Sequence, residues 1–163
     1  MTAGFLKMVL VGALIVPTFS LAQAPSPAQL RDAQRKAALK DLQEALEAFY
    51  HDGGTYPTMS CYSGSTAAGT GCWSLANGGT NLMGPITRNY VDALPADPKQ
   101  AGSSCSSPGA YGYQYVGKAG GGSYTLVTRL ENRSDPEGRT GIVAGCTWGG
   151  GSPAPVSYAI TNQ

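Results

Sequence analysis

The sequence is poor in charged side chains, which make up 13% of its 163 residues, against roughly 25% in an average globular domain. Lys and Arg total 11, Asp and Glu total 10, and no basic stripe suited to a phosphate backbone occurs, so we expect no nucleic-acid partner. Histidine is also scarce, because His51 is the only one, and neither a G-x-S-x-G nor an H-E-x-x-H motif is present. A single histidine at the end of a predicted helix is typical of a terminal or surface residue. We therefore expect a non-catalytic protein.

Long hydrophobic runs are absent as well. The most apolar stretch, Met8–Val16, has about nine residues, far fewer than the roughly 20 that a membrane-spanning helix needs. Lys7 precedes this stretch, Pro17 follows it, and the segment ends in Ala22-Gln-Ala24. These features are typical of a secretory signal peptide cleaved after Ala24. We therefore expect an exported protein, periplasmic, cell-surface or extracellular, with one globular domain at residues 25–163.

The four cysteines form no C-x-x-C pair, which excludes a redox or zinc site of that spacing. An even number in an exported chain indicates two disulfides, for which three pairings are possible. We favour Cys61–Cys72 and Cys105–Cys146, because the first pair would close a short loop rich in Gly, Ser and Thr. Closing a loop of about a dozen residues stabilises a fold by roughly 3 kcal/mol.

One amphipathic helix is predicted at residues 27–52. Ser26 can act as the N-cap, Pro27 suits the first helical position, and Gln29 can complete a capping box. Four apolar residues then recur at spacings of three and four, forming one stripe: Leu39, Leu42, Leu46 and Phe49. Charged residues occupy the other positions, with Asp32 and Lys36 at ion-pair spacing, and the glycines at 53 and 54 end the helix.

The rest of the chain divides into a looped segment, 53–110, and a sheet, 111–163. Glycine and proline, which favour turns, recur throughout the looped segment. Strands are predicted at 111–116 and 124–130, joined by a glycine turn, then at 142–148, with a fourth at 156–160. The helix must bury its stripe against these strands. We therefore predict an α+β fold with one helix packed on a small antiparallel sheet.

Three tyrosines alternate along the first predicted strand, at Tyr111, Tyr113 and Tyr115. Alternate residues of a strand point to the same face, so the three rings should lie together. Packing against the helix is the favoured interpretation. The alternative is a candidate binding face that would stack on sugars or contact a partner protein.

Three pieces of the chain together resemble the globular domain of type IV pilins and type II secretion pseudopilins. Arg31–Pro57 resembles the second half of the pilin helix, which typically ends in a Tyr-x-x-x-Gly-x-Tyr-Pro turn. Tyr90–Pro98 is similar to the Tyr-hydrophobic-x-x-Leu-Pro-x-Asp-Pro segment that precedes the pseudopilin sheet, and Tyr111–Val116 with Tyr124–Asn132 resembles its first two strands. The pieces occur in family order over about 100 residues.

The resemblance implies a non-catalytic structural subunit of a type IV pilus or a type II secretion filament, whose partners are other pilin or secretion-system subunits. Such subunits polymerise through an apolar half-helix that precedes the globular domain. A signal peptide at residues 1–24 would remove that half-helix. The alternative is then a secreted, soluble pilin-like head that binds an extracellular protein or glycan, with membrane contact only if the N-terminal segment is retained.

Two further expectations follow from the resemblance. Residues 1–24 can alternatively be a degenerate pilin leader processed between Gly4 and Phe5, although Val9 stands where the family carries glutamate. Some pseudopilins bind calcium in the sheet region, which draws attention to four acids: Asp92, Asp97, Asp135 and Glu137. Calcium needs six or more oxygens, and no compact run supplies them, so we expect no cofactor, with calcium as the alternative.

Overall fold

In this computed structural model, the described residues are 23–58, 60–63, 86 and 89–162. The longest element is α1, at Pro27–Gly53. The predicted capping box is present, because the Ser26 hydroxyl accepts from the N–H of Gln29 and the Gln29 side chain accepts from the N–H of Ser26. Gly54 ends the helix in the left-handed conformation, φ 73°, and its N–H donates to the Tyr50 carbonyl.

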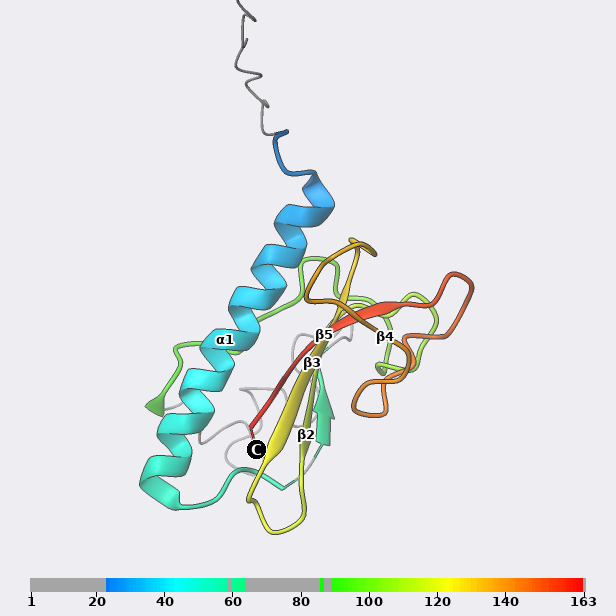
Figure 1. Ribbon diagram of the computed structural model, residues 1–163. Helices are drawn as coiled ribbons and strands as arrows, with labels where there is room; N and C mark the ends of the chain where they lie inside the picture. Colours follow the sequence, from blue (N-terminus) through cyan, green and yellow to red (C-terminus); the bar gives the residue numbers. More distant parts are fainter. Residues whose placement is uncertain (1–22, 59, 64–85, 87–88, 163) are drawn as a thin grey trace, which may run out of the picture.

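The predicted α+β class is confirmed, because α1 accompanies a five-stranded antiparallel sheet in the order β1-β2-β3-β5-β4 (Figure 1). Its strands are β1 Ser60–Tyr62, β2 Tyr113–Gly117, β3 Tyr124–Leu130, β4 Arg139–Thr140 and β5 Val156–Thr161. The elements β2, β3 and β5 lie where strands were predicted, whereas β1 falls within the segment predicted to be looped.

The strand predicted at 142–148 is wrong. This segment has one isolated bridge, between Val143 and Cys146, and otherwise turns. Its backbone enters the left-handed region at Ala144 and Trp148, with φ values of 51° and 50°, as well as at Gly145. An extended strand cannot contain such residues. The alternation of apolar residues here arises because the turns fold over a hydrophobic cluster.

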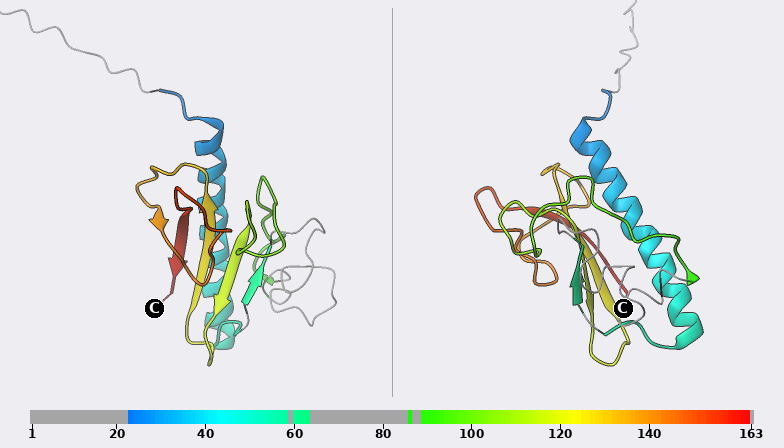
Figure 2. Two further views of the ribbon diagram at one scale, coloured as in Figure 1. Left: turned by 90° about the vertical axis from the view of Figure 1, so that its right-hand side faces the viewer. Right: turned by 180° about the vertical axis from the view of Figure 1, so that it is seen from behind.

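The sheet is covered on both faces (Figures 1 and 2). On one face, the apolar stripe of α1 packs on the side chains of β2, β3 and β5, with Leu39, Leu42 and Leu46 fully buried. On the other face, the 141–152 loop packs Trp148 against Val127, and the Trp148 indole N–H donates to the Ser157 hydroxyl at 2.8 Å. The first turns of α1 extend beyond the end of the sheet (Figure 1).

Candidate functional site

The most unusual polar feature of the described residues is an arginine buried under the helix. Arg35 lies on α1 with none of its surface exposed, and its guanidinium is surrounded by three carboxylates. It binds Asp97 through two hydrogen bonds of 2.7 and 2.9 Å, Asp32 at 2.8 Å and Glu131 at 2.7 Å. We refer to these four residues as the buried ion cluster.

Three separate parts of the chain supply the cluster. Asp32 and Arg35 are one turn apart on α1, Asp97 comes from the segment before the sheet, and Glu131 follows β3. Asp32 also accepts from the backbone N–H groups of Glu131 and Asn132, at 2.7 to 3.0 Å. The predicted pairing of Asp32 with Lys36 is therefore wrong. The buried ion cluster fastens α1 to both the Asp97 segment and the end of β3.

The charges of Glu131 and Arg35 are maintained by their neighbours. Hydrogen bonds from Arg31, Lys99 and Arg35 outweigh burial and hold the pKa of Glu131 well below its usual range. Burial alone would lower the pKa of Arg35, but its hydrogen bonds to Asp97, Glu131 and Asp32 raise that pKa above its ordinary value. Both groups therefore remain charged at neutral pH, as compensated buried ions require.

The three tyrosines of the candidate binding face have different environments. Tyr113 and Tyr115 lie in the core beneath α1, where their packing agrees with the favoured interpretation. Tyr111 is partly exposed, and three cations approach its ring. The charged groups of Arg35, Lys99 and Arg129 lie 4.8, 4.7 and 4.7 Å from the ring centre. Only Tyr111 of the three therefore reaches the surface.

Three of the four acids considered for calcium bind side-chain cations instead. Asp97 belongs to the buried ion cluster, while Asp135 and Glu137 accept from the Lys36 ammonium at 2.6 and 2.7 Å. Asp92 is exposed on the segment after α1. Within the described part of the chain, no three His, Cys, Asp or Glu side chains are grouped so that they could hold a metal ion.

The predicted Cys105–Cys146 disulfide is present and joins two loops on the face of the sheet opposite α1. It also brings Trp148 into place, because the Trp148 backbone N–H donates to the Cys105 carbonyl at 2.7 Å. In the other predicted pair, Cys61 lies on β1, and Cys72 falls outside the described residues.

A second polar cluster lies near the C-terminal end of α1. The Glu47 carboxylate accepts from the Tyr56 and Tyr124 hydroxyls at 2.7 and 2.9 Å, and from the Asn162 amide at 2.9 Å. Burial would raise the pKa of Glu47, but these hydrogen bonds lower it. His51, on the last turn, is exposed and lies 3.2 Å from Asp52. Glu47 and His51 near this end of α1 therefore both have side-chain partners.

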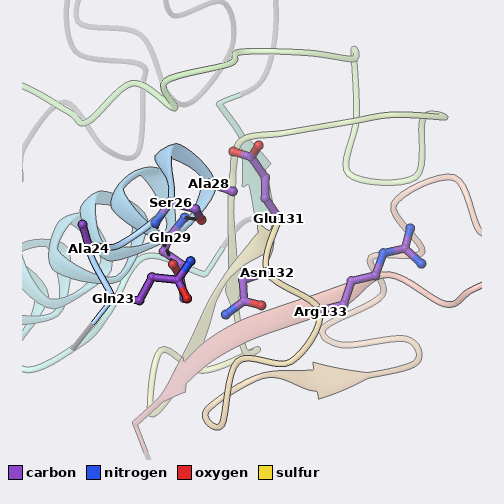
Figure 3. A pocket seen from close by; sticks show the side chains of 8 residues that line it. All are labelled: Gln23, Ala24, Ser26, Ala28, Gln29, Glu131, Asn132 and Arg133. Carbon is purple, nitrogen blue, oxygen red and sulfur yellow. Dashed lines mark hydrogen bonds between the residues drawn. The ribbon is translucent and has the colours of Figure 1, made fainter. Parts of the chain in front are cut away.

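An open cleft of about 590 Å³ lies between the start of α1 and the segment after β3 (Figure 3). Eight residues line it: Gln23, Ala24, Ser26, Ala28, Gln29, Glu131, Asn132 and Arg133. The Ser26 hydroxyl is engaged in the helix cap, and Glu131 is bound by three cations.

The residue that sequence reasoning missed is Arg35. The sequence did contain a signal for Arg35. Leu46, Leu42 and Leu39 are separated by four and three residues, and the same spacing continued toward the N-terminus gives Arg35 and then Asp32. Two opposite charges on the buried stripe of a helix indicate an internal ion pair, since an unpaired charge there would be too costly. Their partners, Asp97 and Glu131, are more than 60 residues away and have no local signal.

Within the described residues, no helix is both long and apolar enough to cross a membrane. No protein-family model, curated protein or solved structure matches this chain.

Proposed function

We propose that this chain is a non-catalytic, pilin-like or pseudopilin-like component of a filament system in the cell envelope. The observation that carries the proposal is the pairing of Asp97 with Arg35. Asp97 belongs to the Leu-Pro-Ala-Asp-Pro segment that resembles the pseudopilin family, and Arg35 belongs to the helix piece of the same resemblance. Two pieces noted separately in the sequence are thus joined by a buried, bidentate ion pair.

The turn after α1 supports the same proposal. Tyr50 and Tyr56, the two tyrosines of the Tyr-x-x-x-Gly-x-Tyr-Pro motif, stack with ring centres 4.5 Å apart, and Gly54 between them forms the helix cap. Tyr56 is buried and contacts the Tyr124 ring on β3 at 4.8 Å. The motif therefore sets the direction in which the chain leaves α1 and reaches the sheet.

The second candidate function is a secreted, soluble pilin-like head that binds an extracellular protein or glycan. The start of α1 favours it. Gln23–Ser26 is not helical, the Ser26 backbone is extended, and the capping box satisfies the N–H groups of Ser26 and Gln29. A polymerising pilin, as the resemblance implies, would instead continue its helix upstream without a break. A cap at this position suits a domain whose helix begins here.

One experiment separates the two functions. Filaments sheared from the source cells would be purified, and the chain followed by immunoblot in the filament and soluble fractions, with an assembly-deficient strain as the control. The soluble material would be analysed by intact mass under non-reducing conditions. Co-purification with filaments from assembly-competent cells alone supports the filament component. Absence from filaments rejects it, and a soluble chain that begins at Pro25 supports the secreted head.

A further inference from the structure

The charges of α1 are distributed unevenly along its length. Its first half, residues 27–40, carries two arginines and two lysines with a single acid, and its first turn contains no acidic residue. Its second half, residues 41–53, carries four acids and no lysine or arginine. The first turn itself, residues 27–30, is uncharged, so the cations lie beyond the residues on which the helix dipole acts most strongly.

At the surface, this end of the domain is more positive than its sequence suggests, because its acids are more buried than its cations. The carboxylates of the buried ion cluster are inside, with Asp32 and Asp97 at most 3% exposed. The cations around them reach solvent, with side-chain exposures of 32% for Arg31 and 41% for Lys99. Arg129 is partly exposed and Arg133 is exposed. We call Arg31, Lys99, Arg129 and Arg133 the basic end.

Shared contacts link Arg31, Lys99 and Arg129 of the basic end. Arg31 and Lys99 bind the same oxygen of Glu131, at 2.6 and 2.7 Å. Lys99 and Arg129 approach the same Tyr111 ring. Arg133 lines the cleft that Glu131 also lines (Figure 3). With Arg35, these residues supply five positive charges against three carboxylates, whereas residues 25–163 as a whole carry no net charge.

Arg129 and Arg133 supply the excess charge. Among the described residues neither forms an ion pair. Arg129 donates to the Ala110 carbonyl at 3.4 Å, and Arg133 donates to the Pro153 carbonyl at 3.1 Å. A guanidinium has five N–H donors, so most of their donors remain available for an oxyanion. Phosphate suits such a surface because arginine binds it in a bidentate manner.

The basic end also lies where the chain leaves the domain. Gln23, the first described residue, lines the same cleft as Glu131 and Arg133. The sequence preceding it contains the apolar stretch Met8–Val16 and Lys7. We propose that the basic end docks on the anionic phosphate headgroups of a membrane surface, with an attraction of roughly fivefold in partitioning per cation. This inference goes beyond the proposed function, because it applies to a filament component and to a soluble head alike.

The test is co-sedimentation of the full chain with lipid vesicles, either of phosphatidylcholine alone or of phosphatidylcholine mixed with phosphatidylglycerol. The test variant is Arg129→Gln/Arg133→Gln, which leaves the buried ion cluster intact. The matched control is Lys40→Gln/Lys118→Gln, which removes the same charge from exposed sites outside the basic end. Residues 1–22 are identical in all three proteins, so any membrane affinity of the apolar stretch cancels. Circular dichroism would verify that each variant is folded.

We expect stronger binding to the anionic vesicles, weakened by salt, and a loss of about 25-fold in the test variant with near wild-type binding by the control. Equal binding to both vesicle types overturns the inference, and so does an equal loss in the control. If the basic end instead serves an acidic protein, all three chains will bind vesicles alike, which also overturns it. The chain can be absent from filaments while vesicle binding still depends on Arg129 and Arg133, so the two proposals fail separately.

Discussion

Replacing Arg35 by methionine tests whether the buried ion cluster holds the domain together. The substitution keeps most of the side-chain volume and removes the guanidinium. Asp97 would keep the hydrogen bond from the Lys99 backbone N–H, at 2.8 Å, and lose both hydrogen bonds from Arg35. Asp32 would keep its backbone donors, and Glu131 would keep Arg31 and Lys99. Asp97 and Asp32 are therefore both left as buried carboxylates without a counter-ion, and Asp97 is the less well compensated because it keeps a single hydrogen bond.

Removing one partner of a buried ion pair costs about 3–5 kcal/mol, because the remaining charge stays desolvated. Small domains unfold with a free energy of about 5–15 kcal/mol, so Arg35→Met should remove a large part of the stability. Replacing both partners, in Arg35→Met/Asp97→Leu, removes the less well compensated of these two charges. The double variant should therefore recover part of the loss, since apolar side chains of similar volume often replace a buried pair without cost.

The measurement is urea unfolding followed by tryptophan fluorescence at neutral pH under non-reducing conditions. Arg31→Met is the matched control, because Arg31 is partly exposed and Glu131 retains two other cations, so it should cost less than about 1 kcal/mol. The reasoning is refuted if Arg35→Met costs no more than Arg31→Met. It is also refuted if the double variant is as unstable as the sum of Arg35→Met and Asp97→Leu.

Three further predictions use the same unfolding assay. Gly117→Ala should lower the free energy of unfolding by about 1–3 kcal/mol, because the added methyl group would overlap the Pro57 carbonyl oxygen. Gly122 has open space around it, so the control Gly122→Ala should be neutral. Equal effects of the two substitutions would contradict this packing. Cys105→Ala/Cys146→Ala opens a loop with a sequence separation of 41 and should cost about 4 kcal/mol, and a loss below about 1 kcal/mol would contradict its role. Because the folded pKa of Glu131 is lowered, chiefly by Arg31, its stabilisation is complete above about pH 4.5 and is lost as the pH falls through the folded pKa. Glu131→Gln should therefore flatten the acid limb of the stability curve, and an unchanged limb would contradict this assignment.

Much of the fold could be predicted from local patterns. The helix occupies the predicted residues to within one position, because Ser26, Gln29 and Gly54 satisfy its ends through contacts within a few residues. Strands β2, β3 and β5 lie where alternating apolar residues predicted them. The short strands β1 and β4 had no such pattern, because each exists through pairing with a longer neighbour.

The candidate site depended on contacts distant in sequence. The spacing of Asp32 and Arg35 with the leucine stripe was visible, but their partners lie up to about 100 residues away. The same is true of the basic end, whose cations come from α1, the Asp97 segment, β3 and the segment after it. The near-neutral net charge gave no indication of this surface, because a count of charged residues does not distinguish buried acids from exposed cations.

The sequence by itself therefore determined the helix, its caps, three strands, the α+β class and the favoured Cys105–Cys146 pairing, because each follows from residue type at short spacing or from a small set of alternatives. Only the tertiary structure decided that 142–148 turns over Trp148 instead of forming a strand, and that Arg35 is buried among carboxylates. The physical reason is common to both. A left-handed residue and a buried charge are each costly alone, and each is stable only because the folded chain brings distant partners to it.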